Sequence, residues 1–69
     1  MFEVAKKIQQ NVGAEAQAIV DYTELLECIT EADIGGKDEL IADIAEIIQD
    51  ELDHEAKLKS IYERLVSEL

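Results

Sequence analysis

A glutamate and a histidine stand three residues apart within residues 49–58 of the chain. Residues three apart on a helix share one face, so the carboxylate of Glu51 and the imidazole of His54 would project side by side. His54 is the only histidine in the sequence. A carboxylate and an imidazole placed in this way can bind one metal ion or share a pair of them. The two residues are therefore a candidate metal site, provided that the rest of the chain supplies further ligands.

The first half of the chain carries a heptad stripe that predicts one long helix over residues 2–32. The stripe consists of Ala5, Ile8, Val12, Glu15, Ile19, Tyr22, Leu26 and Ile29. Alternating steps of three and four residues are typical of a helix in a bundle or coiled coil, and Glu15 is the only charged member. Gly13 is open to three interpretations: a close helix approach, a bend, or a helix that begins at Asn11.

A second stripe predicts another helix over residues 38–68. Its members are Leu40, Ile44, Ile47, Glu51, His54, Leu58, Ile61 and Leu65, and a flanking row adds Ile41, Ile48, Tyr62 and Leu69. Residues 33–37 form the expected turn, in which Gly35 and Gly36 would cap the first helix because glycine tolerates positive φ. A connection this short makes the two helices antiparallel neighbours.

The polar interruptions of the two stripes converge in the folded hairpin. Residues whose numbers sum to about 70 face each other, which places Glu15 level with His54 and Glu55 and leaves Glu51 about 5 Å away along the axis. An ionised carboxylate among apolar side chains costs several kcal/mol unless it is paired. A cation bound by Glu15, Glu51 and His54 would meet that need, and this ligand set suits iron or manganese, with zinc also possible. Glu55 is expected to be a solvated or supporting acid.

Composition limits both the fold and the partners. The chain has 69 residues, one cysteine and a net charge of −11, so it repels nucleic acid and anionic membranes and attracts cations. A chain of this size usually needs a metal or oligomerisation to complete its core. The apolar faces are too wide for two helices, which predicts a homodimer that forms a four-helix bundle, or a higher even-numbered oligomer. The lone thiol and the lack of a targeting segment predict a cytoplasmic protein, either free or inside a protein compartment.

The two motifs together resemble half of a ferritin-like di-iron protein of the rubrerythrin and encapsulated-ferritin kind. The first helix reproduces the family pattern with Glu15, Ala18 and Tyr22, and the second reproduces Glu-x-x-His followed by an apolar residue with Glu51, His54 and Leu58. The likeness spans nearly the whole chain as a single ferritin-like hairpin, residues 1–69.

The resemblance implies a function as well as an all-α fold. Glu15 and His54 would both be ligands to one metal, Glu51 would bridge two metals, and Tyr22 would lie beside the ligands. A dimer would then hold two iron ions and act as a ferroxidase, oxidising Fe(II) with oxygen or peroxide. Two alternatives stay open from the residues alone: a metal-free helical hairpin that only dimerises or docks on partner helices, and a metal that only stabilises the dimer.

Overall fold

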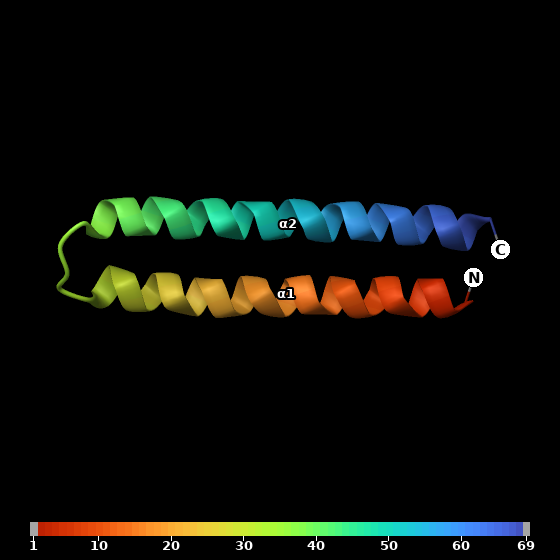
Figure 1. Ribbon diagram of the computed structural model, residues 1–69, viewed down its shortest axis with the longest axis horizontal. Coiled ribbons are helices and arrows are strands. Elements are labelled where there is room, and N and C mark those ends of the chain that lie inside the picture. The colour runs from red at the N-terminus through yellow and green to blue at the C-terminus, as the bar shows by residue number, and fades with distance from the viewer. Residues whose placement is uncertain (1, 69) are drawn as a thin grey trace.

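The chain forms an antiparallel pair of long helices joined by a short turn. The computed structural model describes residues 2–68, with α1 at Phe2–Glu31 and α2 at Lys37–Ser67. Each boundary lies within one residue of the expected position. The helices lie side by side with the turn at one end and both chain termini at the other (Figure 1), in a body of 53 × 14 × 10 Å. The predicted all-helical hairpin is therefore confirmed.

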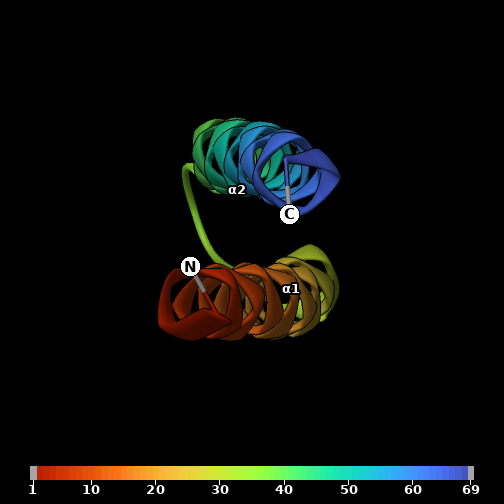
Figure 2. The same cartoon turned by 90° about the vertical axis from the view of Figure 1, so that its right-hand side faces the viewer.

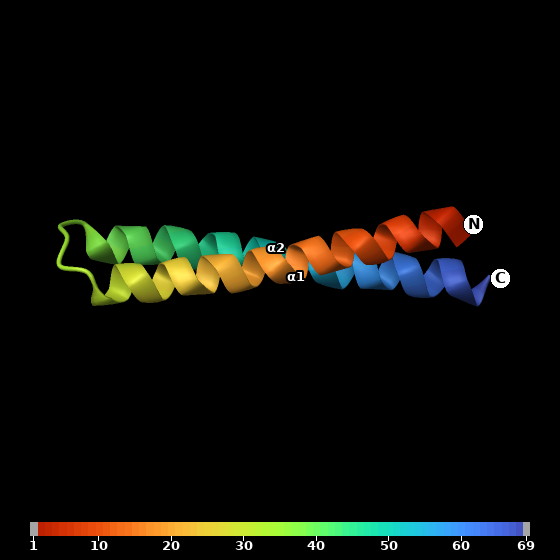
Figure 3. The ribbon, with the colours of Figure 1, turned by 90° about the horizontal axis from the view of Figure 1, so that it is seen from below.

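The two helices pack along a single stripe and leave most of their surface in contact with solvent. Figure 2 shows them end on, and Figure 3 shows that they cross near the middle. None of residues 2–68 is fully buried. The half-buried positions of α1 include every member of the predicted stripe, from Ala5 to Ile29. Within the same residues, neither helix is both long and apolar enough to cross a membrane.

In α2, the row that faces α1 differs from the predicted one. The half-buried members are Ile41, Ile44, Ile48, Glu51, Glu55, Leu58, Tyr62 and Leu65. The predicted members Leu40, Ile47, His54 and Ile61 are instead exposed. The apolar face of α2 is wider than one partner helix can cover, so the predicted row marks the middle of that face while α1 covers one edge of it. Leu69, the last member of the flanking row, lies outside the described residues.

The turn uses its glycines differently from the expectation. The helical hydrogen-bond pattern of α1 extends to Ala32, whose N–H donates to the Cys28 carbonyl at 3.0 Å. Of the turn glycines, only Gly36 has a positive φ, at 71°. It precedes α2, and its carbonyl accepts the hydrogen bond of the Leu40 N–H at 3.1 Å. Gly36 therefore turns the chain into α2 and does not cap α1. The expectation that Gly35 caps α1 is also wrong, because its φ is not positive and α1 ends at Glu31.

Two of the three interpretations of Gly13 are also wrong. The helix runs through this position without a break, so it does not begin at Asn11. The Asn11 side chain instead donates to the Lys7 carbonyl at 2.8 Å. A Cβ added to Gly13 would meet nothing within 4 Å, so α2 does not approach α1 closely at this position.

Candidate metal centre

The structure brings the three predicted ligands together near the middle of the hairpin. Glu15 comes from α1, and Glu51 and His54 come from successive turns of α2. Each residue offers one ligand atom, and the three atoms lie within 4.8 Å of one another. A single ion can sit among atoms at such separations, since metal–oxygen and metal–nitrogen bonds to proteins are roughly 2.0–2.2 Å long. The antiparallel pairing places these groups together, as the residue numbering predicts.

The carboxylate of Glu15 is the least satisfied group of the cluster. Its Oε2 atom is buried and has no hydrogen-bond partner among the residues that the structure describes. The nearby Nδ1 atom of His54 lies 3.8 Å away, which is too long for a hydrogen bond. A buried polar atom without a partner carries a desolvation cost of about 1–3 kcal/mol, and more when it is charged. A cation between these side chains would remove that cost, so the donor set fits a bound metal.

Charge and exposure show how a metal would be accommodated. The two carboxylates carry two negative charges when ionised, which one divalent cation balances, and neutral imidazole adds a third ligand without further charge. The Glu15 side chain is 24% exposed and that of His54 is 57% exposed. One side of the cluster is therefore covered by the hairpin and the other is open to solvent. Three protein ligands with one open side leave room for further ligands from outside the chain.

Glu55 occupies a more interior position than the sequence predicted. It lies in the row of α2 that faces α1, and its side chain is only 18% exposed. Its Oε1 atom pairs with the Lys59 ammonium at 2.6 Å. Glu55 shares a heptad row with Ile48 and Tyr62, and the sequence pattern predicts that this row only flanks the stripe. Its charge already has a partner, so Glu55 lacks the need for a cation that Glu15 shows.

Tyr22 is half-buried on α1, seven residues after Glu15 on the same heptad row. Residues seven apart lie on one face about two turns apart, roughly 10 Å along the helix. The predicted role of its hydroxyl group beside the metal ligands stays a prediction.

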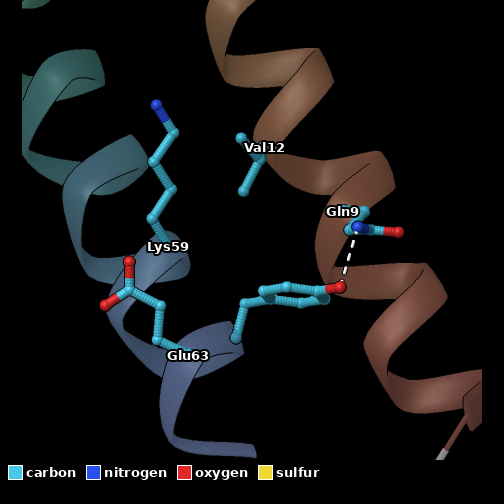
Figure 4. A pocket seen from close by; sticks show the side chains of 5 residues that line it. Gln9, Val12, Lys59 and Glu63 are labelled. Atoms are coloured by element: carbon cyan, nitrogen blue, oxygen red, sulfur yellow. Dashed lines mark hydrogen bonds between the residues drawn. The ribbon is translucent and has the colours of Figure 1, made fainter. Parts of the chain in front are cut away.

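A hollow nearer the chain termini is distinct from this cluster. Figure 4 shows its lining, in which the Gln9 amide donates a hydrogen bond to the Tyr62 hydroxyl at 3.0 Å. Val12, Lys59 and Glu63 complete the wall. Gln9 and Lys59 each directly follow a residue of the helix interface, Ile8 and Leu58, whereas His54 precedes the interface residue Glu55. The hollow therefore opens on the side of the hairpin opposite to His54.

Comparison with known proteins adds no relative to this description. The resemblance to ferritin-like proteins therefore depends on the two sequence motifs alone. No family model, no curated protein and no solved structure matches the chain.

Proposed function

We propose that this hairpin binds Fe(II) through Glu15, Glu51 and His54 and oxidises it in a site shared by two chains. The observation that carries the proposal is the buried Oε2 atom of Glu15, which lacks a hydrogen-bond partner among residues 2–68 while it lies beside two further ligands. A carboxylate in that position destabilises a hairpin that only packs on other helices, and it is useful in a hairpin that binds a cation.

The ligand types favour iron over the other candidates. Carboxylate oxygens and one imidazole, without thiolates, are the donors found in carboxylate-bridged iron and manganese sites. Carboxylates also adapt well to a change of metal charge, because they can bind through one oxygen or bridge with both. Manganese and zinc remain candidate occupants of the same ligand set.

A second copy of the chain would double the cluster. Two hairpins supply four carboxylates and two imidazoles, and two divalent cations balance the four negative charges. This is the ligand set of the ferritin-like di-iron bundles that the motifs resemble, with a Glu from each of two helices and Glu-x-x-His from each of the other two. In that arrangement Glu51 of each chain would bridge the two irons and Tyr22 would stand beside them.

Iron is the substrate of the proposed reaction. The reaction needs two ions at one site, because the oxidant takes up two electrons. Each of two Fe(II) ions loses one electron. Dioxygen takes both electrons with two protons and becomes hydrogen peroxide, or hydrogen peroxide takes them with two protons and becomes two waters. The protein would hold the two ions close enough together for one oxidant to collect both electrons.

The test is a titration of the metal-free protein with Fe(II), first without oxygen and then in air. Native mass spectrometry would follow the mass, and absorbance would follow ferric iron. We expect saturation near one iron per chain, dimers, and ferric absorbance that rises on oxygenation. Stoichiometric binding without oxidation would reduce the role to a structural metal. Dimers that bind no metal would contradict the proposal and leave a helical interaction module. The observation that favours this second function is the set of exposed apolar residues on both helices.

A further inference from the structure

One side of the hairpin is apolar and uncovered. Every second residue of the helix interface is Ala5, Val12, Ile19 and Leu26 in α1, and Ile41, Ile48, Glu55 and Tyr62 in α2. Because the helices are antiparallel, the residues that directly precede these positions lie on the same side of the hairpin in both helices. We call this the apolar side face; it comprises Val4, Asn11, Ala18 and Leu25 of α1 and Leu40, Ile47, His54 and Ile61 of α2, of which only Asn11 and His54 are polar. Leu25, Leu40, Ile47 and Ile61 are each 36–43% exposed. The opposite side is more mixed, since it carries the polar residues Gln9, Thr23, Thr30 and Lys59 among the apolar residues Phe2, Ala16, Ala45, Leu52 and Val66.

The metal cluster opens onto the apolar side face. His54 belongs to that face, and Glu15 and Glu51 occupy the interface row next to it. A second hairpin laid on this face would cover the open side of the cluster. The accessible surface of the hairpin is 5121 Å², whereas a compact monomer of this mass exposes roughly 4,300 Å². The excess, roughly 800 Å², is about what each partner buries in a stable dimer.

A row of charged residues, acidic at one end and basic at the other, runs beside the apolar side face on α2. We call it the charged row; it consists of Asp43, Asp50, Lys57 and Arg64, all exposed. The acidic half lies toward the turn and the basic half toward the chain termini. A two-fold axis through His54 and perpendicular to the helix places residues opposite each other when their numbers sum to about 108. Asp50 then faces Lys57 of the second copy, and Asp43 faces Arg64.

The other two-fold arrangement brings like charges together. If the two turns lay at the same end, α1 would lie against α2 of the second copy. Residues of the two copies would then face each other where their numbers sum to about 70. Lys7 on α1 would then stand beside Arg64, and Asp21 would stand beside Asp50. Lys7 and Asp21 belong to the α1 row that corresponds to the charged row. Like charges in direct contact across an interface cost several kcal/mol, so this arrangement is disfavoured.

The overall distribution of charge favours the same orientation. Residues 21–53, which form roughly the half nearer the turn, hold twelve acidic residues and one lysine. Residues 1–20 and 54–69 hold five acidic and five basic residues. The net charge of −11 therefore resides in one half of the hairpin, while the other half is neutral. Turns at the same end would place two strongly acidic halves in contact, whereas turns at opposite ends place each acidic half against a neutral one.

From these observations we infer that a second copy docks on the apolar side face in the antiparallel orientation, with His54 of both copies at the two-fold axis. Ile47 then packs on Ile61 of the second copy, and the charged rows form four ion pairs per dimer. The two metal clusters meet at the axis. The inference rests on the pairing of hairpins in the proposed function, and it assigns the face, the orientation and the register of that pairing.

Charge reversal tests the orientation. The first variant, Asp43→Lys with Asp50→Lys, makes the charged row wholly basic. The second, Lys57→Glu with Arg64→Glu, makes it wholly acidic. The third combines all four substitutions, which keeps the net charge and restores opposite charges only in the antiparallel register. The control is Glu46→Lys with Asp53→Lys, which makes the same change of net charge as the first variant on the outer face of α2.

The dissociation constant of the dimer would be measured in about 0.1 M salt, where screening acts over about 10 Å, with EDTA and again with Zn(II). We expect each double reversal to weaken dimerisation by at least about tenfold. A mixture of the two should form heterodimers, and the combined variant should dimerise like the wild type. The control should not weaken dimerisation. Circular dichroism would verify that the helices persist.

Three outcomes would overturn this docking. The first is a combined variant that dimerises no better than the double reversals, and the second is a double reversal that behaves like the wild type. The third is a wild-type chain that stays monomeric under both conditions. A failure of iron oxidation alone would leave the orientation intact, because the measurement needs no iron.

Discussion

At the residue scale, the decisive group is a carboxylate that has no hydrogen-bond partner within residues 2–68. The Oε2 atom of Glu15 is buried beside His54 Nδ1 at 3.8 Å, with Glu51 in the same cluster. Glu55 at nearly the same level is ion-paired with Lys59. The two interior acids therefore differ in a way that predicts function: the charge of Glu55 is compensated within the chain, and that of Glu15 is available for a cation.

Removal of one ligand should abolish metal chemistry without unfolding the hairpin. We expect Glu51→Ala to eliminate Fe(II) oxidation and to weaken metal binding by at least about tenfold, since each carboxylate contributes charge and a donor atom. Stopped-flow absorbance and a binding titration would measure this. Glu46→Ala on the outer face of the same helix is the matched control and should behave like the wild type. Unchanged oxidation in Glu51→Ala would exclude Glu51 from the mechanism.

Replacement of Glu15 should separate stability from function. Glu15→Leu completes the apolar stripe of α1 and removes the unpartnered carboxylate. We expect the metal-free protein to gain about 1–3 kcal/mol in free energy of unfolding and to lose metal binding. Urea denaturation at fixed protein concentration would measure the first, and titration the second. Glu24→Leu, on an exposed position of the same helix, should give no such gain. A destabilised Glu15→Leu variant would indicate that Glu15 has a partner in the metal-free state.

At the scale of the helices, the two positions that need explanation are glycines. Gly13 lies inside a continuous helix with open space around it, whereas Gly36 holds a φ of 71° before α2. Glycine therefore lowers the stability of the helix at position 13, whereas the conformation of the turn requires it at position 36.

Alanine substitution should have opposite effects at these two glycines. Gly13→Ala should stabilise the protein by about 1 kcal/mol, because alanine favours the helix and meets no neighbour. Gly36→Ala should destabilise it by about 1–2 kcal/mol, because the left-handed conformation strains a residue with a Cβ. Thermal unfolding of both variants at equal concentration would compare them directly. Destabilisation by Gly13→Ala would show that another chain approaches this part of α1.

At the scale of the whole molecule, the described part of the hairpin has no closed core. None of residues 2–68 is fully buried, and Leu25, Leu40 and Ile61 are more than 40% exposed. Two helices packed along one stripe gain little hydrophobic stabilisation for the conformational entropy that a 69-residue chain loses. Assembly with a second copy would bury the rest of the apolar faces.

The stability should consequently depend on protein concentration. We expect the thermal midpoint to rise between 1 and 100 µM protein, because mass action adds about 2.7 kcal/mol per dimer over a hundredfold range. Circular dichroism with and without added Zn(II) would measure it. A midpoint that does not change over this range would mean that one hairpin, unassisted, is the stable unit.

Residue spacing is enough to predict the helical hairpin and the level at which its polar groups meet. Heptad spacing identifies both helices, since a helix repeats its face at steps of three and four residues. The short glycine turn makes them antiparallel, and the position of Glu15 opposite His54 then follows from counting residues. Such features depend on distance along the chain, which the sequence contains.

Residue spacing does not predict which edge of α2 meets α1. Leu40, Ile47 and Ile61 belong to the same wide apolar face as Ile41 and Ile48, and helical periodicity cannot divide such a face between two partners. The packing against α1 makes that division, through the shapes and contacts of both helices together. The same packing leaves the Oε2 atom of Glu15 buried without a partner among the described residues and His54 exposed, because burial belongs to the assembled surfaces and not to either helix alone.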